Sequence, residues 1–244
     1  MEDIIKDLLS KDRFDIDDLV NVVIVLRSEN GCPWDKVQTH RSIKKDFLEE
    51  VYEVMEAIDC ESPEMMREEL GDVLLQVVFH TVIEQENGNF VLEDVITELC
   101  QKLIVRHPHV FGNVNADTVD KVLTNWDAIK KETKGQETYT DTLKSVPKNF
   151  PALMRAQKLG KRAARAGIDF GSAEEIMNVL KGMINNNAYI EDILFVCANA
   201  ERHLSEDAEE QLAGACDRFV ERFEELEKSG RDLTQIPAGE LYSY

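Results

Sequence analysis

Apolar residues recur along almost the whole chain at spacings of three and four residues, the period of one face of an α-helix. Alternation of apolar and polar residues, which would indicate strands, is nearly absent. Capping residues, glycines and prolines divide the pattern into predicted helices. These helices cover residues 15–26, 42–58, 62–86, 92–106, 117–133, 152–166, 173–185, 189–204 and 205–229. The pattern therefore predicts an all-α protein.

We expect two helical bundles in tandem, because a linker-like stretch interrupts the series of predicted helices. The stretch KGQETYTDTLKSVPKNFP at 134–151 contains one glycine, two prolines and many small polar residues, a composition typical of a linker. We predict an N-terminal helical domain over 1–134, a linker over 135–151 and a C-terminal helical domain over 152–244.

The two predicted domains also resemble each other in sequence. EELGDVLLQVVFH at 68–80 is similar to YIEDILFVCANA at 189–200, and QKLIVRH at 101–107 is similar to DRFVERF at 217–223. Two copies of this size indicate a duplicated bundle rather than a solenoid of many repeats.

Acidic residues gather on two consecutive predicted helices. Glu50 and Glu53 are three residues apart, and so are Glu69 and Asp72, so each pair projects from one side of its helix. The short turn DCESPE between the helices makes them antiparallel neighbours, which lets the pairs face each other across the border of the apolar stripes. Charged residues on amphipathic helices are usually a solvated face, and that reading stays open at this point.

Facing carboxylates at the edge of a core repel one another strongly unless cations lie between them. A set of oxygen ligands without histidine or cysteine selects hard divalent ions, Mg²⁺ or Mn²⁺. The paired acids therefore indicate a magnesium site.

Charge and cysteine usage narrow the class of protein. The 244 residues carry 48 acidic and 28 basic side chains and a net charge of −20, which argues against double-stranded nucleic acid and against acidic membrane surfaces as partners. A polyanionic substrate requires cations or a local basic cluster. The five cysteines form no C-x-x-C pair, and no segment approaches the roughly twenty apolar residues of a membrane span. We expect a reduced, cytoplasmic protein without a signal peptide.

The acidic stretches resemble a known signature. EEVYE at 49–53, followed after fifteen residues by ELGD at 69–72, is similar to the E-E-x-x-E and E-x-x-D motifs of the MazG-type nucleoside triphosphate pyrophosphohydrolases. Further similar stretches follow in the family's order: LRSENGCPWDKVQTHRSI, EELGDVLLQVVFH, KLIVRHPHVFG, NWDAIKKE and SVPKNFPALMRAQKLGKRAARAGIDF. The resemblance covers nearly the whole chain.

This resemblance implies an all-α fold, a homodimer with four-helix-bundle active sites, and hydrolysis of nucleoside triphosphates to monophosphate and pyrophosphate, for house-cleaning or control of nucleotide pools. It implies Mg²⁺, with Mn²⁺ as a possible substitute. Carried onto this chain, the implied metal ligands are Glu50, Glu53, Glu69 and Asp72. Lys102 and Arg106 would hold the phosphates and Trp126 would contact the base. Glu49 is our candidate to orient or deprotonate the attacking water.

The C-terminal copy departs from the family's pattern. Asn178 and Tyr189 stand where carboxylates are needed, and Glu191 and Asp192 are adjacent rather than three residues apart. We therefore expect the N-terminal copy to keep the chemistry. Two other classes remain open: a non-catalytic module that binds metal, nucleotide or a partner, and a purely structural helical dimer.

Overall fold

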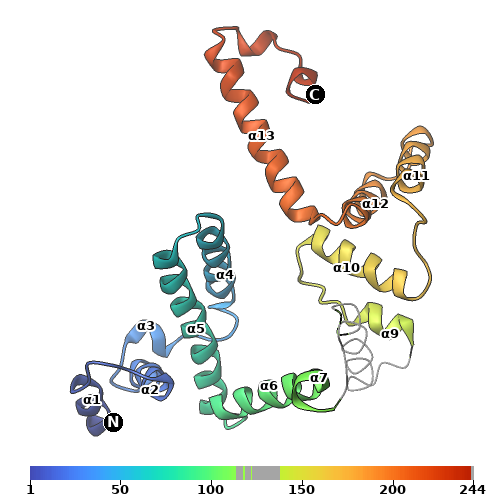
Figure 1. Ribbon diagram of the computed structural model, residues 1–244. Coiled ribbons are helices and arrows are strands. Elements are labelled where there is room, and N and C mark those ends of the chain that lie inside the picture. Colours follow the sequence, from blue (N-terminus) through green and yellow to red (C-terminus); the bar gives the residue numbers. More distant parts are fainter. Residues whose placement is uncertain (114–117, 119–121, 123–137, 243–244) are drawn as a thin grey trace. The chain divides into compact units, whose positions relative to one another are not determined.

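The computed structural model describes residues 1–113, 118, 122 and 138–242, and within these ranges it contains helices and no strand (Figure 1). The predicted all-α class is confirmed. The chain divides into two compact units, Met1–Val122 and Leu123–Tyr244. No helix among the described residues is long and apolar enough to cross a membrane.

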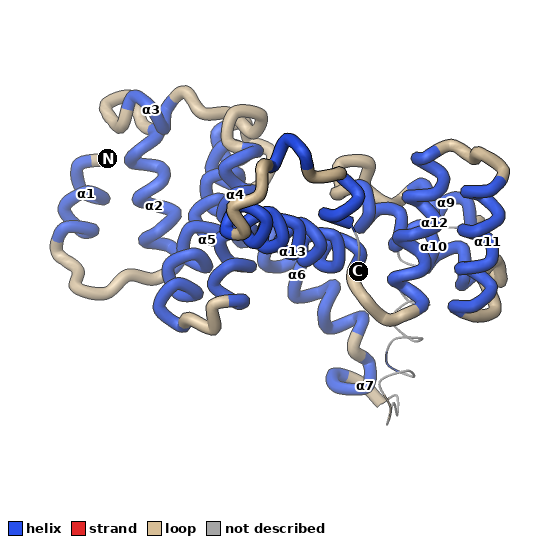
Figure 2. Tube along the Cα trace, turned by 90° about the horizontal axis from the view of Figure 1, so that it is seen from above, coloured by secondary structure: helices blue, strands red, loops and turns tan. Residues whose placement is uncertain are grey.

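The N-terminal unit is built around one long helix, α5. Its helices are α1 (Glu2–Leu9), α2 (Ile16–Arg27), α3 (Pro33–Lys36), α4 (Lys44–Asp59), α5 (Pro63–Glu86), α6 (Leu92–Arg106) and α7 (Pro108–Phe111). Helices α4 and α5 form an antiparallel hairpin, and α2 lies beside α5 in both views (Figures 1 and 2). Helix α6 leaves from the C-terminal end of α5.

Local sequence signals explain the ends of these helices. Asp15 caps α2 by accepting hydrogen bonds from the backbone of Asp17 and Asp18. Ser62 caps α5 by accepting from the backbone of Met65, with Pro63 in the first turn. After α5 the chain turns at Gly88, whose φ of +73° lies in the left-handed region that glycine adopts without strain.

The core of the N-terminal unit surrounds the C-terminal half of α5. Every buried residue of α5 lies at Gln76 or beyond, whereas α4 buries only Ala57. The buried apolar cluster consists of Val23, Ile43, Val78, Phe79, Val82, Ile83 and Leu92. The half of the hairpin that carries the predicted acids is therefore thinly packed within one chain.

Arg27, at the end of α2, fastens the segment that leads into α4. Its side chain is 5% exposed and forms a bidentate ion pair with Glu86, with Nε–Oε1 and Nη2–Oε2 distances of 2.8 and 2.7 Å. Its Nη1 donates to the backbone oxygens of Asp35 and Gln38, at 2.7 and 3.2 Å. The guanidinium also lies over the ring of Phe79, 5.0 Å from its centroid. One side chain thus joins α2, α5 and the connection to α4.

The C-terminal unit is also built of helices, and its buried apolar clusters are smaller than that of the N-terminal unit. It contains α9 (Tyr139–Lys144), α10 (Ala152–Arg165), α11 (Ala173–Asn185), α12 (Ile190–His203), α13 (Ala208–Lys228) and the 3₁₀ helices η1 (Leu233–Gln235) and η2 (Ala238–Tyr242). Helix α12 packs against α10 and α11 through two small clusters. At Gly160 of α10, an added Cβ would lie 1.5 Å from Oδ1 of the buried Asn199, so the close contact of α10 and α12 requires glycine.

Several helical bounds differ from the prediction. The helix expected over 205–229 begins at Ala208, because Asp207 supplies the cap. Part of the stretch expected to be a linker, 139–144, is helical, with Thr138 and Asp141 forming a capping box. The helix expected over 117–133 falls largely outside the described residues, so the domain limits 1–134 and 152–244 stay predictions.

Arg27→Met is expected to destabilise the N-terminal unit by about 2 kcal/mol, because it leaves two backbone oxygens and the Glu86 carboxylate without their donor. Urea denaturation followed by circular dichroism and tryptophan fluorescence measures the change. The matched control is Lys228→Met, which removes an exposed pair with Glu224 and is expected to cost less than about 0.5 kcal/mol. Equal effects of the two substitutions would contradict the role given to Arg27.

Candidate active site

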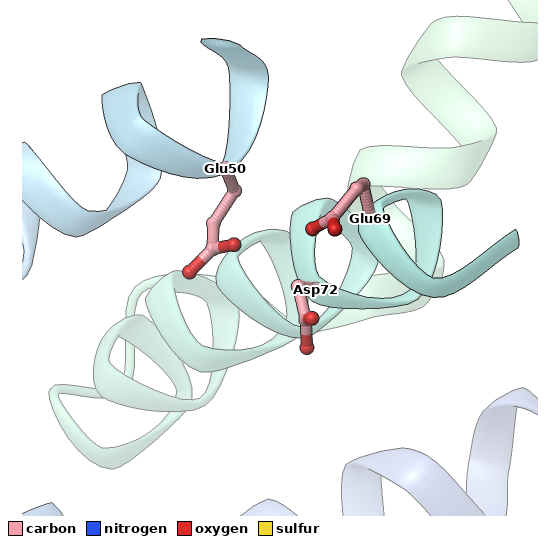
Figure 3. A group of neighbouring side chains, drawn as sticks. All are labelled: Glu50, Glu69 and Asp72. Carbon is pink, nitrogen blue, oxygen red and sulfur yellow. The ribbon is translucent and has the colours of Figure 1, made fainter. Parts of the chain in front are cut away.

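Three carboxylates converge on the α4–α5 hairpin. Glu50 comes from α4, and Glu69 and Asp72 come from successive turns of α5 (Figure 3). One carboxylate oxygen from each lies within 4.8 Å of the other two. Figure 3 shows Glu50 and Glu69 pointing toward each other across the hairpin. The spacing of three residues on α5 and the antiparallel turn thus bring the acids together as the sequence predicts, although their role as metal ligands stays a prediction.

Glu53, one turn after Glu50, lies at the rim of this group. It is exposed, but its carboxylate lies close enough to those of Glu69 and Glu50 to raise the pKa of both. All four acids of the two predicted pairs therefore interact. Glu49 is exposed on α4 and is not one of the three converging carboxylates.

Burial and mutual repulsion make this group costly to ionise. Burial raises the pKa of Glu50, with further increases from the charges of Asp72, Glu53 and Asp46. Burial likewise raises the pKa of Glu69, followed by its hydrogen bond with Glu53 and the charges of Glu53 and Glu68. A divalent cation placed among the oxygens would remove this repulsion.

The donor set fits a hard divalent ion. The three converging side chains offer only carboxylate oxygens, which suit Mg²⁺ and Mn²⁺ and are a poor match for softer metals that prefer nitrogen or sulfur. A group of this kind occurs nowhere else among the described residues. In the C-terminal unit, Glu191 and Asp192 are exposed in the first turn of α12, and Asn178 lies on α11.

Sequence reasoning missed Gln76. It lies one turn after Asp72 on α5 and is 9% exposed. Its side chain hydrogen-bonds to the carboxylate of Glu50, which partly offsets the rise of the Glu50 pKa. The signal that could have found it is an amide at i+4 from an acid, inside the otherwise apolar run LLQVV.

A second polar contact follows one turn further along α5. The rings of His40 and His80 stack with centroids 5.0 Å apart, and their Nδ1 atoms are 2.7 Å from each other. His40 Nε2 lies 2.5 Å from Oε1 of Glu84. Burial and the nearby His40 lower the pKa of His80. These contacts fasten the segment before α4 to α5, so the hairpin is fixed at its base by this contact and by Arg27.

The remaining predicted site residues lie elsewhere. Lys102 and Arg106 are on α6, which starts beyond the far end of α5. Asp72 and Glu86 are separated by fourteen residues of continuous helix, or about 21 Å at the rise of an α-helix. Figure 1 shows α6 continuing from that end without folding back along α5, so the structure does not bring this basic pair to the carboxylates within one chain. Trp126 lies outside the described residues.

Comparison with known proteins agrees with this geometry. Residues 38–111, which include the α4–α5 hairpin and α6, match the model of the MazG nucleotide pyrophosphohydrolase domain. The chain is 40% identical over 229 residues to the "Nucleoside triphosphate pyrophosphohydrolase" of Escherichia coli (strain K12), covering 87% of each protein. The chain belongs to the MazG family.

Two more relatives show how far the MazG likeness extends. The "Nucleoside triphosphate pyrophosphohydrolase/pyrophosphatase MazG" of Thermotoga maritima is 40% identical over 242 residues, with 93% of each chain covered. The "Nucleoside triphosphate pyrophosphohydrolase" of Mycobacterium tuberculosis is 38% identical over 153 residues, or 62% of this chain and 46% of that protein. The likeness to MazG proteins thus includes both units in some relatives.

Glu50→Gln is expected to stabilise the metal-free protein at pH 7 to 8. The folded-state pKa of Glu50 is raised above the ordinary value of 4.5, so ionisation favours the unfolded chain. Below pH 4.5, Glu50 is protonated in the folded and the unfolded chain, and the unaltered protein keeps its full stability. As the pH rises through the raised pKa of Glu50, the unaltered protein loses stability relative to the variant. Thermal denaturation in chelator across this pH range measures the difference.

The control for this experiment is Glu56→Gln, an exposed acid of α4 outside the converging group. Its denaturation midpoint should follow that of the unaltered protein at every pH. If Glu50→Gln behaved like Glu56→Gln, the repulsion ascribed to the three carboxylates would be absent.

Proposed function

We propose that the protein is a Mg²⁺-dependent nucleoside triphosphate pyrophosphohydrolase, which converts a nucleoside triphosphate to the monophosphate and pyrophosphate. The observation that carries the proposal is the convergence of Glu50, Glu69 and Asp72, whose oxygens lie within 4.8 Å of one another. The names of the Escherichia coli and Thermotoga maritima relatives support the same activity. Removal of aberrant or excess nucleotides in the cytoplasm is the role that fits this activity, and the free state of all five cysteines supports that compartment.

The chemistry of the substrate explains the need for this site. A triphosphate brings about four negative charges to a protein whose own net charge is −20, so positive charge must be supplied locally. Bound Mg²⁺ would offset the phosphate charge and ease deprotonation of the attacking water. Glu50, Glu69 and Asp72 would hold the ion, and Glu53 would complete the group from its position beside Glu69.

Glu49 is the residue we assign to the attacking water. It is an exposed residue of α4 next to Glu50, and it is not one of the three converging carboxylates. The water oxygen forms a bond to the α-phosphorus. The bond between this phosphorus and the oxygen that bridges to the β-phosphate breaks. Glu49 takes the proton of the water, and pyrophosphate leaves.

We assign the chemistry to the N-terminal unit. In the C-terminal unit the matching positions carry Asn178 and Tyr189, which offer no carboxylate. Glu191 and Asp192 are adjacent on α12, so they point in different directions and do not converge on one ion. The C-terminal unit then supports folding and assembly rather than hydrolysis.

A homodimer is the assembly we propose, with the active sites in a four-helix bundle. The thinly packed half of the hairpin and the neighbouring α6 leave a large set of apolar side chains exposed, which is characteristic of an interface. These are Leu48, Val51, Tyr52, Met55, Ile58, Leu70, Leu74, Ile96, Leu99, Leu103, Ile104 and Val105. A second hairpin packed on this surface would bury them.

The same dimer would supply the phosphate-binding pair. Lys102 and Arg106 lie on α6, which follows the end of α5 at Glu86, and that end is about 21 Å from Asp72. In an antiparallel pair of hairpins, the end of one α5 approaches the acids of the other. We therefore propose that Lys102 and Arg106 of one chain bind the phosphates held at the carboxylates of its partner, with Trp126 at the base.

Asp72→Asn is expected to lower kcat/KM for nucleoside triphosphates at least about 100-fold, because it removes a charged ligand of the ion. Pyrophosphate release from a mixed triphosphate pool, measured with Mg²⁺, with Mn²⁺ and with excess chelator, tests this. The matched control is Asp192→Asn in the C-terminal copy, which should stay within about twofold of the unaltered enzyme. Full turnover in chelator would refute the metal-dependent mechanism, and equal losses in the two variants would refute the assignment to the N-terminal unit.

We expect Arg106→Ala, like Asp72→Asn, to have little activity by itself, because it removes a phosphate-binding group. Mixing equal amounts of the two variants is then expected to restore about a quarter of the activity. Random pairing makes half of the dimers mixed, and one of the two sites in each mixed dimer then has intact acids and an intact basic pair. Mixing Asp72→Asn with Glu69→Gln is the control, because both changes fall in the same group of acids and no site becomes whole. Absence of recovery in the first mixture would place the basic pair and the acids in the same chain.

A further inference from the structure

Gln76 is a polar side chain in an apolar setting, directly beside the carboxylate group. It lies on α5 one turn after Asp72, and Val78 and Phe79 of the core follow it within three residues. With 9% of its surface exposed, it marks the border between the acids and the buried apolar cluster. An amide at this border is not explained by packing alone, because an apolar side chain of the same length would fill the space.

The nitrogen and the oxygen of the Gln76 side-chain amide differ in their hydrogen bonding. The Gln76 side chain lowers the pKa of the neighbouring Glu50 carboxylate as a hydrogen-bond donor, and Nε2 is the one atom of this side chain that can donate. Its Oε1 is buried and has no hydrogen-bond partner among the described residues. A buried carbonyl oxygen without a partner costs stability, so such groups in native proteins usually accept a hydrogen bond in the working state.

We propose that Gln76 is a positioning residue of the ion site: its amide nitrogen holds the Glu50 carboxylate in place, and its carbonyl oxygen accepts a hydrogen bond from a water molecule on the divalent ion. The inference rests on the proposed function, because it requires that Glu50 binds an ion. Mg²⁺ suits it, since this ion usually keeps several of its water molecules when it binds to protein carboxylates. Residues that orient metal ligands in this way typically change metal affinity 10- to 100-fold when they are replaced.

The proposal predicts that Gln76 matters little for the stability of the metal-free protein and much for ion binding. Gln76→Met keeps the length and approximate shape of the side chain and removes both hydrogen-bonding ends. Two effects oppose each other in the metal-free variant: the buried carbonyl without a partner is gone, and the Glu50 carboxylate loses its donor. Its unfolding temperature should therefore stay close to that of the unaltered protein. Its affinity for Mg²⁺ should fall about 10- to 100-fold. A side chain that only supports the fold would lower stability and leave the affinity of the folded protein unchanged.

The experiment is calorimetric titration of the full-length protein with MgCl₂ in the absence of nucleotide, together with thermal denaturation in chelator. The matched control is Thr81→Val, a buried polar residue of the same helix whose Oγ1 donates to the backbone oxygen of Val77. It should leave the Mg²⁺ affinity unchanged.

Each outcome decides one question. If the unaltered protein bound no Mg²⁺, the proposed function would fail, and the inference about Gln76 with it. If it bound Mg²⁺ and Gln76→Met bound equally well, the inference alone would be wrong. Gln76→Leu serves as a second apolar replacement; if neither variant folded, the amide would be a requirement of the fold and the proposal would be overturned.

Discussion

Repulsion among carboxylates that are held close together is the constraint on which the N-terminal unit depends. The α4–α5 hairpin brings Glu50, Glu69 and Asp72 within 4.8 Å of one another, and it does so at a place where burial already raises the pKa of two of them. A hairpin that carries such a group needs an anchor elsewhere. The anchor is the other half of α5, where the apolar cluster, Arg27 and the contact between His40 and Glu84 fix the helix. Stability and the candidate chemistry are thus supplied by opposite halves of one helix.

Long helices and the acid pairs could be predicted from the sequence because both depend on local periodicity. The helix over 92–106 was predicted with the bounds that the structure has, and the spacing of Glu69 and Asp72 placed both on one side of α5. Short helices such as α3 and α7 were not predicted, since four residues carry too little periodicity and depend on their surroundings. Arg27 and Gln76 escaped notice for a related reason: the first acts through partners up to 59 residues away, and the second is polar in a run that looks apolar.

The position of Lys102 and Arg106 shows a second limit of prediction from sequence. Sequence spacing relates Lys102 to Arg106 within α6 but says nothing about the distance from α6 to the acids. That distance is set by α5, which continues unbroken from Pro63 to Glu86 and carries α6 away from the carboxylates. The requirement for positive charge near the phosphates and the exposed apolar side chains on α4, α5 and α6 both support the homodimer that we propose. The two arguments are independent, because one concerns charge and the other concerns exposed area.

The unbroken course of α5 also restricts how this protein can change over evolutionary time. The acids and the apolar cluster share one helix, so the number of residues between Asp72 and Val78 fixes the direction in which the carboxylates point relative to the core. Adding or removing a single residue there would rotate one group against the other by about 100°. Point substitutions on the exposed faces of this helix leave that direction unchanged. Insertions and deletions between the acids and the apolar cluster would turn the carboxylates away from each other's helix while the core stayed packed. The spacing along α5 is therefore a constraint that the fold and the carboxylate group share.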